Sequence, residues 1–188
     1  MTDAERIAPY QSILERFPDH VKAIGMSSIE IANLDIHLGE LFGAILRIDK
    51  RAGAAIYLIP QSAIASLDML KSLIDAIYPD DTSQRKHLIS LYKRALQIKN
   101  KRDRLVHDAW GTNTDGEPVR RDIKADKPMV RVGIEELNED IYNIRSLTTD
   151  VITAINWFEQ FLPPLPRRVV GESMPNDTEQ LKPIKVDN

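Results

Sequence analysis

Residues 20–50 read HVKAIGMSSIEIANLDIHLGELFGAILRIDK, and the spacing of the apolar residues in this stretch decides the fold class. Eight positions recur at alternating intervals of three and four, and six of them are apolar: Val21, Ile24, Ser28, Ile31, Asp35, Leu38, Phe42 and Ile45. This period is typical of a helix that buries one face against other helices. Asp19, which follows Pro18, is a suitable residue to cap its N-terminus.

The same period returns in three later stretches. The second helix is expected over residues 60–77, with Pro60 in its first turn, and the third begins near Thr82 and Ser83. The last begins around Glu135 and runs to Leu162, where Pro163 and Pro164 stop it. A shorter helix is expected near residues 6–16. The pattern therefore predicts an all-α, up-and-down antiparallel bundle of four to five helices.

Three segments interrupt this pattern. The helical period breaks around Gly53, and the apolar run 54–59 is too short to assign. Residues 111–116 have the composition of a loop, and a β-hairpin of 118–123 with 129–132 is a candidate insert before the last helix. The pattern predicts a single domain over residues 1–165, followed by a disordered tail over 166–188.

Composition excludes several classes of protein. The chain has 188 residues, 43% hydrophobic and 28% charged, which is ordinary for one globular domain. Cysteine is absent, which rules out disulfides, thiolate catalysis and cysteine-bound zinc. No apolar run approaches the ~20 residues of a membrane-spanning helix. The first residues lack the features of a signal peptide, so we expect a cytoplasmic protein with no membrane partner.

The net charge of −3 hides a strongly basic segment. Residues 85–131 hold 13 Lys and Arg against six Asp and Glu. Such a run is either a solvated helix face or a site for anions such as nucleic-acid phosphates. The candidate nucleic-acid contacts are Lys99, Lys101, Arg104, Arg94 and Trp110. Trp110 would either stack on a base or plug the end of the third helix.

The stretch with the most chemistry is 99–111, KNKRDRLVHDAWG. Arg102 occupies a stripe position where an apolar residue is expected. A guanidinium there needs a partner or a polar cleft. His107 falls where the helix should be ending, close to Gly111.

Arg102, Asp103 and His107 resemble the Arg-x4–6-His motif of the HEPN superfamily, in which Asn, Asp or His usually follows the arginine. The resemblance implies an antiparallel bundle of four or five helices with the motif near the end of the third main helix. Many HEPN proteins are metal-independent endoribonucleases. The resemblance therefore implies RNA as substrate and neither a metal nor a cofactor.

The roles implied by the resemblance are His107 as general acid or base and Arg102 as phosphate clamp, with Asp103 orienting one of them. Arg102 and His107 lie about 140° apart on a straight helix, so one chain cannot easily present both to one phosphate. HEPN domains commonly dimerise through this helix. We therefore expect a C2 homodimer, or an unwound helix end near His107. Asp108 departs from the family pattern, because small residues are frequent at that position.

Two other interpretations remain open. The bundle could be a non-catalytic protein that binds a partner protein or nucleic acid, with the motif serving as a polar network. It could also be a structural dimer with a solvated basic face. An enzyme of this class would suit a defence or stress toxin, with an antitoxin protein as its partner. Other chemistries lack support, since no Gly-rich phosphate loop is present and His37 has no ligand-spaced partner in Glu30 or Glu40.

Overall fold

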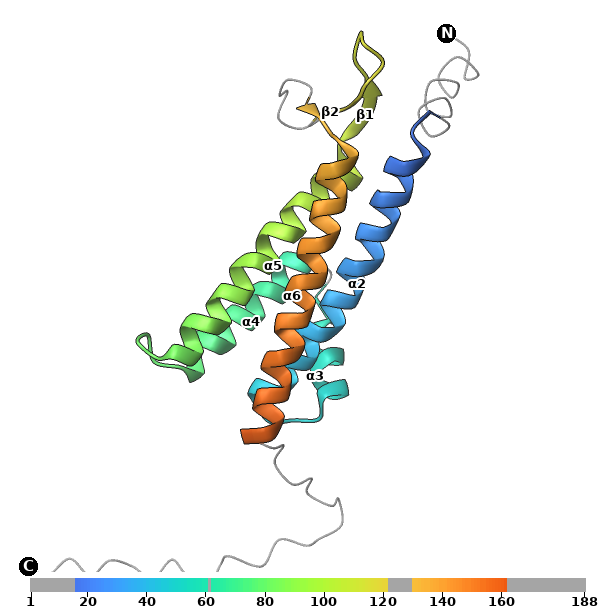
Figure 1. Ribbon diagram of the computed structural model, residues 1–188. Helices are drawn as coiled ribbons and strands as arrows, with labels where there is room; N and C mark the ends of the chain where they lie inside the picture. The colour runs from blue at the N-terminus through green and yellow to red at the C-terminus, as the bar shows by residue number, and fades with distance from the viewer. Residues whose placement is uncertain (1–15, 61, 122–129, 162–188) are drawn as a thin grey trace, which may run out of the picture.

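The computed structural model describes residues 16–60, 62–121 and 130–161, and these form an all-α bundle with a small sheet at one end (Figure 1). This confirms the predicted fold class. The helices are α2 (Pro18–Leu46), α3 (Lys50–Tyr57), α4 (Ala63–Ile77), α5 (Ser83–His107) and α6 (Ile134–Phe161). The strands are β1 (Ala109–Thr112), β2 (Pro118–Arg121) and β3 (Val130–Arg131). None of these described helices is both long enough and apolar enough to cross a membrane.

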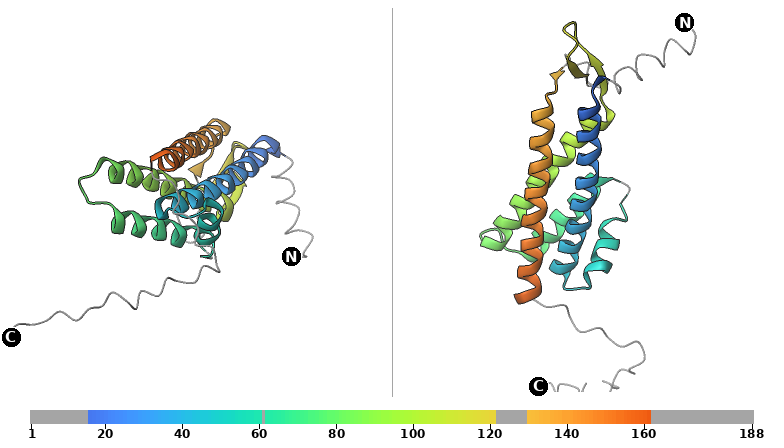
Figure 2. Two further views of the ribbon diagram at one scale, coloured as in Figure 1. Left: turned by 90° about the horizontal axis from the view of Figure 1, so that it is seen from below. Right: turned by 45° about the vertical axis from the view of Figure 1, so that its right-hand side comes forward.

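Consecutive helices alternate in direction, and α4 and α5 form a hairpin that packs behind α2 and α6 (Figure 2). α2 and α6 are neighbours that run parallel, because three helices separate them in the chain. The hydrogen bond from the His20 ring to Val132 O (3.1 Å) joins their starts. The Arg145–Glu30 ion pair (2.7 Å) joins their middles. α5 therefore runs antiparallel to both, and its end reaches the N-terminal ends of α2 and α6.

Gly53 lies inside α3 rather than at a break in the helix. A Cβ placed on Gly53 would come within 2.2 Å of Gly43 Cα, so only glycine allows α3 to approach α2 this closely. The chain instead leaves α2 at Arg47, which adopts a left-handed conformation with φ 58°. Sequence periodicity missed this corner because a glycine at a helix crossing and a glycine at a turn look alike in the sequence.

Helix ends correct two expectations. Asp19 lies in the first turn of α2, whose cap residue is Phe17 and has no side-chain hydrogen bond. Pro60 precedes α4, which begins after Ser62, whose hydroxyl accepts from Ala65 N (3.0 Å). Thr82 caps α5 as predicted. The helix expected near residues 6–16, the stop at 163–164 and the tail 166–188 lie outside the described residues.

The insert between α5 and α6 contains a three-stranded antiparallel sheet in the order β1-β2-β3. The expected pairing of the second and third strands is present, with Val119 opposite Arg131. The first strand corrects the loop assignment, because Gly111 and Thr112 pair with Val119 and Pro118. The predicted hairpin ends at 122–123 and 129 lie outside the described residues.

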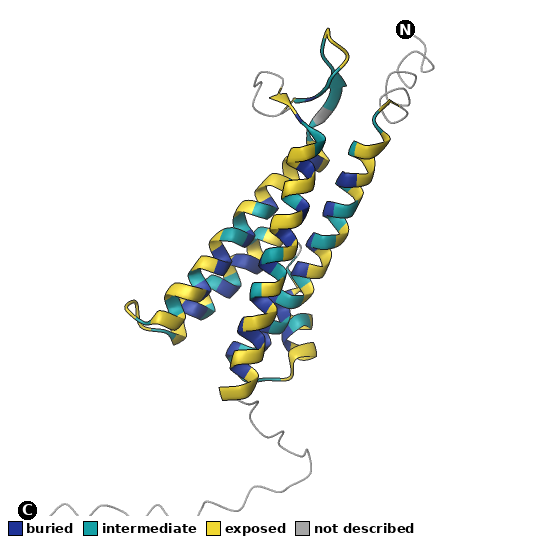
Figure 3. Ribbon diagram, viewed as in Figure 1, coloured by how far each residue is buried: buried dark blue, intermediate teal, exposed yellow. Residues whose placement is uncertain are grey.

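Two apolar clusters hold the bundle together (Figure 3). The main cluster joins buried residues of α2, α4, α5 and α6 with Tyr57 of α3. The second lies at the sheet end and consists of Ala23, Leu105, Val132, Leu137 and Ile141. The end of α5 that carries the Arg102–His107 motif therefore has its own small core.

Candidate active site at the end of α5

α5 remains helical through His107, and Asp108 caps it by donating its backbone N–H to Arg104 O (3.0 Å). The helix end is therefore not unwound before His107. On a regular helix the side chains of Arg102 and His107 then leave in directions about 140° apart. One chain therefore cannot easily present both side chains to one phosphate.

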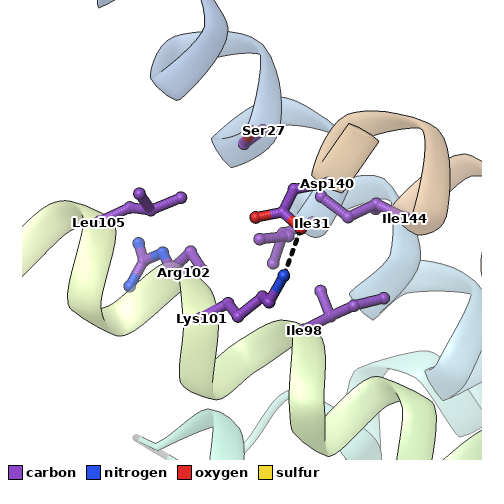
Figure 4. Close-up of a pocket in the computed structure, with 8 residues that line it drawn as sticks. All are labelled: Ser27, Ile31, Ile98, Lys101, Arg102, Leu105, Asp140 and Ile144. Carbon is purple, nitrogen blue, oxygen red and sulfur yellow. Dashed lines mark hydrogen bonds and ion pairs between the residues drawn. The ribbon is translucent and has the colours of Figure 1, made fainter. Parts of the chain in front are cut away.

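Arg102 is half-exposed, and it lies on the side of α5 that shares a cavity with α2 and α6. Its Nη1 donates to Asp103 Oδ1 at 3.2 Å, so Asp103 is placed to orient the guanidinium. Arg102 also lines a cavity between the three helices, and Figure 4 shows the side chains around it. The volume of this cavity is about 20 Å³. The apolar stripe admits an arginine here because its side chain is half-exposed and its guanidinium is paired with Asp103.

His107 is exposed at the last residue of α5, and within the described ranges its ring makes no hydrogen bond or ion pair. The neighbouring Asp108 carboxylate is turned into the sheet, where Arg120 Nη1 of β2 lies 3.3 Å from Oδ2. Both partners are largely buried. The charge of Asp108 is therefore matched by a cation at that position, which lessens its repulsion of a phosphate near His107.

Trp110 plugs the end of α5, one of its two predicted roles. Its indole Nε1 donates to Leu105 O at 2.9 Å, which satisfies one of the free carbonyls at the helix C-terminus. The ring also packs against the second apolar cluster and is only partly exposed. These contacts leave little of the ring for stacking on a base.

The basic residues of α5 differ in how they are used. Arg94 contacts Asp150 (2.5 Å) and Ser146 (3.4 Å) on α6, and Lys101 contacts Asp140 (2.6 Å). Both side chains remain partly exposed, so they can still reach an anion. Arg104 is exposed, with no ion pair to another described residue. Part of the positive charge of this segment is therefore neutralised within the bundle.

The position of Lys99 corrects its prediction as a nucleic-acid contact, because this residue does not lie on the surface. Its side chain is buried and forms an ion pair with Asp35 of α2. Tyr57 of α3 lies close to the same carboxylate, and burial together with Asp35 raises the pKa of its phenol well above the usual value. A sequence signal for this cluster existed, because Asp35 is a charged residue on the apolar stripe of α2.

Ser27 was also missed by sequence reasoning. It is buried on α2 and lines the cavity beneath Arg102, and its hydroxyl has no hydrogen-bond partner among the described residues. Ser28 occupies the stripe position next to it in sequence, so nothing in the periodicity singles out Ser27. Its placement depends on how α2 is rotated against α5 and α6.

A metal site finds no support in the described ranges, where no three His, Asp or Glu side chains converge. His37 pairs with Glu40 one turn along α2, at 2.7 Å between Nδ1 and Oε2. Two residues of one helix do not make a metal centre.

Comparison with known proteins adds no relative to this picture. No family model matches the chain, and neither a curated protein nor a solved structure matches it. The function must therefore be argued from the geometry itself and from the motif.

Proposed function

We propose that this protein is a HEPN-like, metal-independent endoribonuclease that acts as a homodimer. The observation that carries the proposal is the arrangement at the end of α5. An arginine held by the next residue and an exposed histidine, which has no partner among the described residues, follow each other within five residues on a basic helix. The all-α bundle around them agrees with the fold that the HEPN resemblance implies.

The chemistry that these residues can perform is transfer of a phosphodiester to its own 2′-hydroxyl. The 2′-oxygen loses a proton and bonds to phosphorus, while the 5′-oxygen bond breaks and that oxygen gains a proton. A histidine imidazole can accept or donate these protons, which is the role we assign to His107. Arg102 would stabilise the charge that builds on the phosphate oxygens. The products would be a 2′,3′-cyclic phosphate and a 5′-hydroxyl.

The dimer follows from the directions of the two side chains. Because Arg102 faces the bundle seam and His107 leaves α5 about 140° away, a complete cleft needs Arg102 of one chain and His107 of another. A two-fold axis near the ends of two α5 helices would create two identical composite clefts. Val106, which lies within the motif, is exposed, and this suits a contact between copies.

The biological setting that fits this activity is a cytoplasmic toxin of a defence or stress system, kept in check by an antitoxin protein. Uncontrolled cleavage of cellular RNA harms its host, so an enzyme without a dedicated substrate would need such a partner. This setting rests on the HEPN resemblance.

The test is cleavage of an end-labelled, mixed-sequence RNA by the purified protein in EDTA. The His107→Ala variant should lose activity by about 10²–10⁴-fold, the usual contribution of a general acid or base. His87→Ala is the matched control, because His87 is an exposed histidine at the other end of α5. It should cut as the wild type does, and the products should carry cyclic-phosphate ends.

Equal cutting by all three proteins would indicate a contaminating nuclease or a different site. Absence of cutting by the wild type contradicts the catalytic proposal. The protein would then be a non-catalytic bundle that binds a protein or nucleic acid. Retention of the uncut RNA would indicate nucleic acid as the partner, and its absence would favour a protein.

A further inference from the structure

The outer face of α2 is apolar along the N-terminal half of the helix. Ile29 and Ile36 are 57% and 47% exposed. At 100° per residue they lie about 160° and 140° around the helix from the buried Ile31, so they point away from the bundle. Gly25 and Ala32 share this face and are also exposed, and a Cβ on Gly25 would meet nothing within 4 Å. We call Gly25, Ile29, Ala32 and Ile36 the outer stripe.

The C-terminal half of the same face is already a contact between helices. α3 packs there on Gly39 and Gly43, where a Cβ would come within 2.7 and 3.0 Å of α3 backbone atoms. α3 ends at Tyr57 beside Gly39, and no other described helix or strand covers the outer stripe (Figure 2). The outer stripe therefore continues a packing surface but has no partner in the part of the chain that the structure describes.

The order of residues in the outer stripe is self-complementary. Its intervals of four, three and four residues are those of a coiled-coil seam, in which two helices cross at about 20°. A two-fold axis between residues 30 and 31 would place Ile29 opposite Ala32 and Ile36 opposite Gly25 of an antiparallel copy. Each large side chain then meets a small residue. A parallel pair would instead set each isoleucine against itself and leave a gap at each small residue.

Charges at the two ends of the outer stripe favour the same antiparallel arrangement. Lys22 lies three residues before the stripe and is exposed, with no ion pair to another described residue. Glu40 lies four residues after the stripe, and its carboxylate, which contacts His37 of the same helix, is partly exposed. About the same two-fold axis, Lys22 of one copy comes within one residue of facing Glu40 of the other. A parallel pair would set like charges against each other.

We propose that the outer stripe binds a second copy of this chain in an antiparallel α2–α2 pair. Leu58 and Ile59, which follow α3 where it ends beside Gly39, are exposed and extend the apolar surface at the Ile36 end. The four large aliphatic side chains expose on the order of 400 Å² per copy, so with their neighbours a pair reaches the roughly 1,000 Å² of a specific interface.

This contact is separate from the one proposed at the end of α5 and does not rest on the proposed function. Two different two-fold contacts on one chain, with axes that meet at right angles, assemble four copies. The α2 contact alone assembles two. In either case, loss of the α2 contact halves the size of the assembly.

The first measurement is the mass of the full chain in solution by size-exclusion chromatography with light scattering, at tens of micromolar. Ile29→Glu should halve the mass, because the pair would bury its carboxylate without a partner. The matched control is Ile152→Glu, on the exposed side of α6, which should keep the mass of the wild type. Circular dichroism should show both variants folded, since both side chains are exposed. A failure of the proposed function leaves this test standing, because the expected ratio does not depend on the α5 contact.

The second measurement tests the register with disulfides, since the chain has no cysteine of its own. Gly25→Cys and Ile36→Cys are refolded together and oxidised, and a cross-linked pair should form. Gly25→Cys alone should not cross-link, because its two cysteines would lie eleven residues apart along the pair, about 16 Å, which exceeds the reach of a disulfide. A mixture of Gly25→Cys with Ile152→Cys is the control for random collisions.

Three results would overturn the inference. One is a wild type that is monomeric, and another is an Ile29→Glu variant with the mass of the wild type. The third is a cross-linking pattern in which Gly25→Cys reacts with itself, or with Ile152→Cys, as readily as with Ile36→Cys.

Discussion

The buried ion pair between Lys99 and Asp35 allows a quantitative prediction, because its two members are buried to different degrees. The Lys99 side chain is 3% exposed, whereas that of Asp35 is 23% exposed. Replacing Asp35 with Leu leaves an ammonium group in the core with no counter-charge. Removing one partner of a buried pair costs about 3–5 kcal/mol. Replacing Lys99 with Met leaves a carboxylate that water can partly reach, and the loss should be smaller, about 1–3 kcal/mol.

The double variant, Asp35→Leu with Lys99→Met, should be more stable than Asp35→Leu alone. Apolar side chains of similar volume often replace a buried ion pair at little net cost. The coupling between the two substitutions should therefore be favourable and larger than about 1 kcal/mol. In a chain of this length the Asp35→Leu loss corresponds to a melting temperature lower by roughly 10 °C.

The assay is urea unfolding monitored by tryptophan fluorescence and circular dichroism. All variants are measured at one protein concentration, because the stability of the proposed dimer would depend on concentration. Equal losses from the two single variants would refute the argument from unequal burial. Additive losses in the double variant would show that the two side chains do not interact in solution.

Three further predictions concern the packing and titration of the bundle. Gly53→Ala should lower stability by about 1–3 kcal/mol in urea unfolding, because its Cβ would lie 2.2 Å from Gly43 Cα. Gly25→Ala, which meets nothing within 4 Å, should instead raise stability by up to about 1 kcal/mol, and a loss there would contradict the exposed position of Gly25. The pKa of the Tyr57 phenol is raised by burial, so the folded protein holds this proton more tightly than the unfolded chain does. The contribution of the neutral phenol to folding stability is therefore complete below about pH 10 and is lost as the pH rises further. Tyr57→Phe should therefore make the alkaline fall in melting temperature shallower, and an unchanged pH profile would count against burial of this phenol.

Helical periodicity was sufficient to predict the four long helices and their order. Apolar residues at intervals of three and four specify which face of each helix is buried, and residues such as Thr82 mark where a helix begins. Local patterns were insufficient where two helices touch. The role of Gly53 depends on Gly43 of another helix, and the strand β1 depends on pairing with β2.

The candidate site was predicted in part for the same reason. The departure of Arg102 from the apolar stripe is visible in one helix, and the structure places this residue at the rim of a small cavity and pairs it with Asp103. The burial of Lys99 is not visible there, because a lysine in a basic run looks solvated until its partner on α2 is known. The burial of Ser27 likewise depends on how α2 is rotated against α5 and α6, which the sequence of α2 alone does not reveal.

The composite cleft is tested most directly by mixing two inactive proteins. Arg102→Ala and His107→Ala are unfolded, combined in equal amounts and refolded, and RNA cleavage in EDTA is compared with that of each variant alone. Half of the dimers should then be mixed, and one of the two clefts in each mixed dimer should contain both native side chains. We predict recovery of about a quarter of the wild-type activity. If the mixture forms dimers but remains as inactive as its components, the cleft is not shared between two chains.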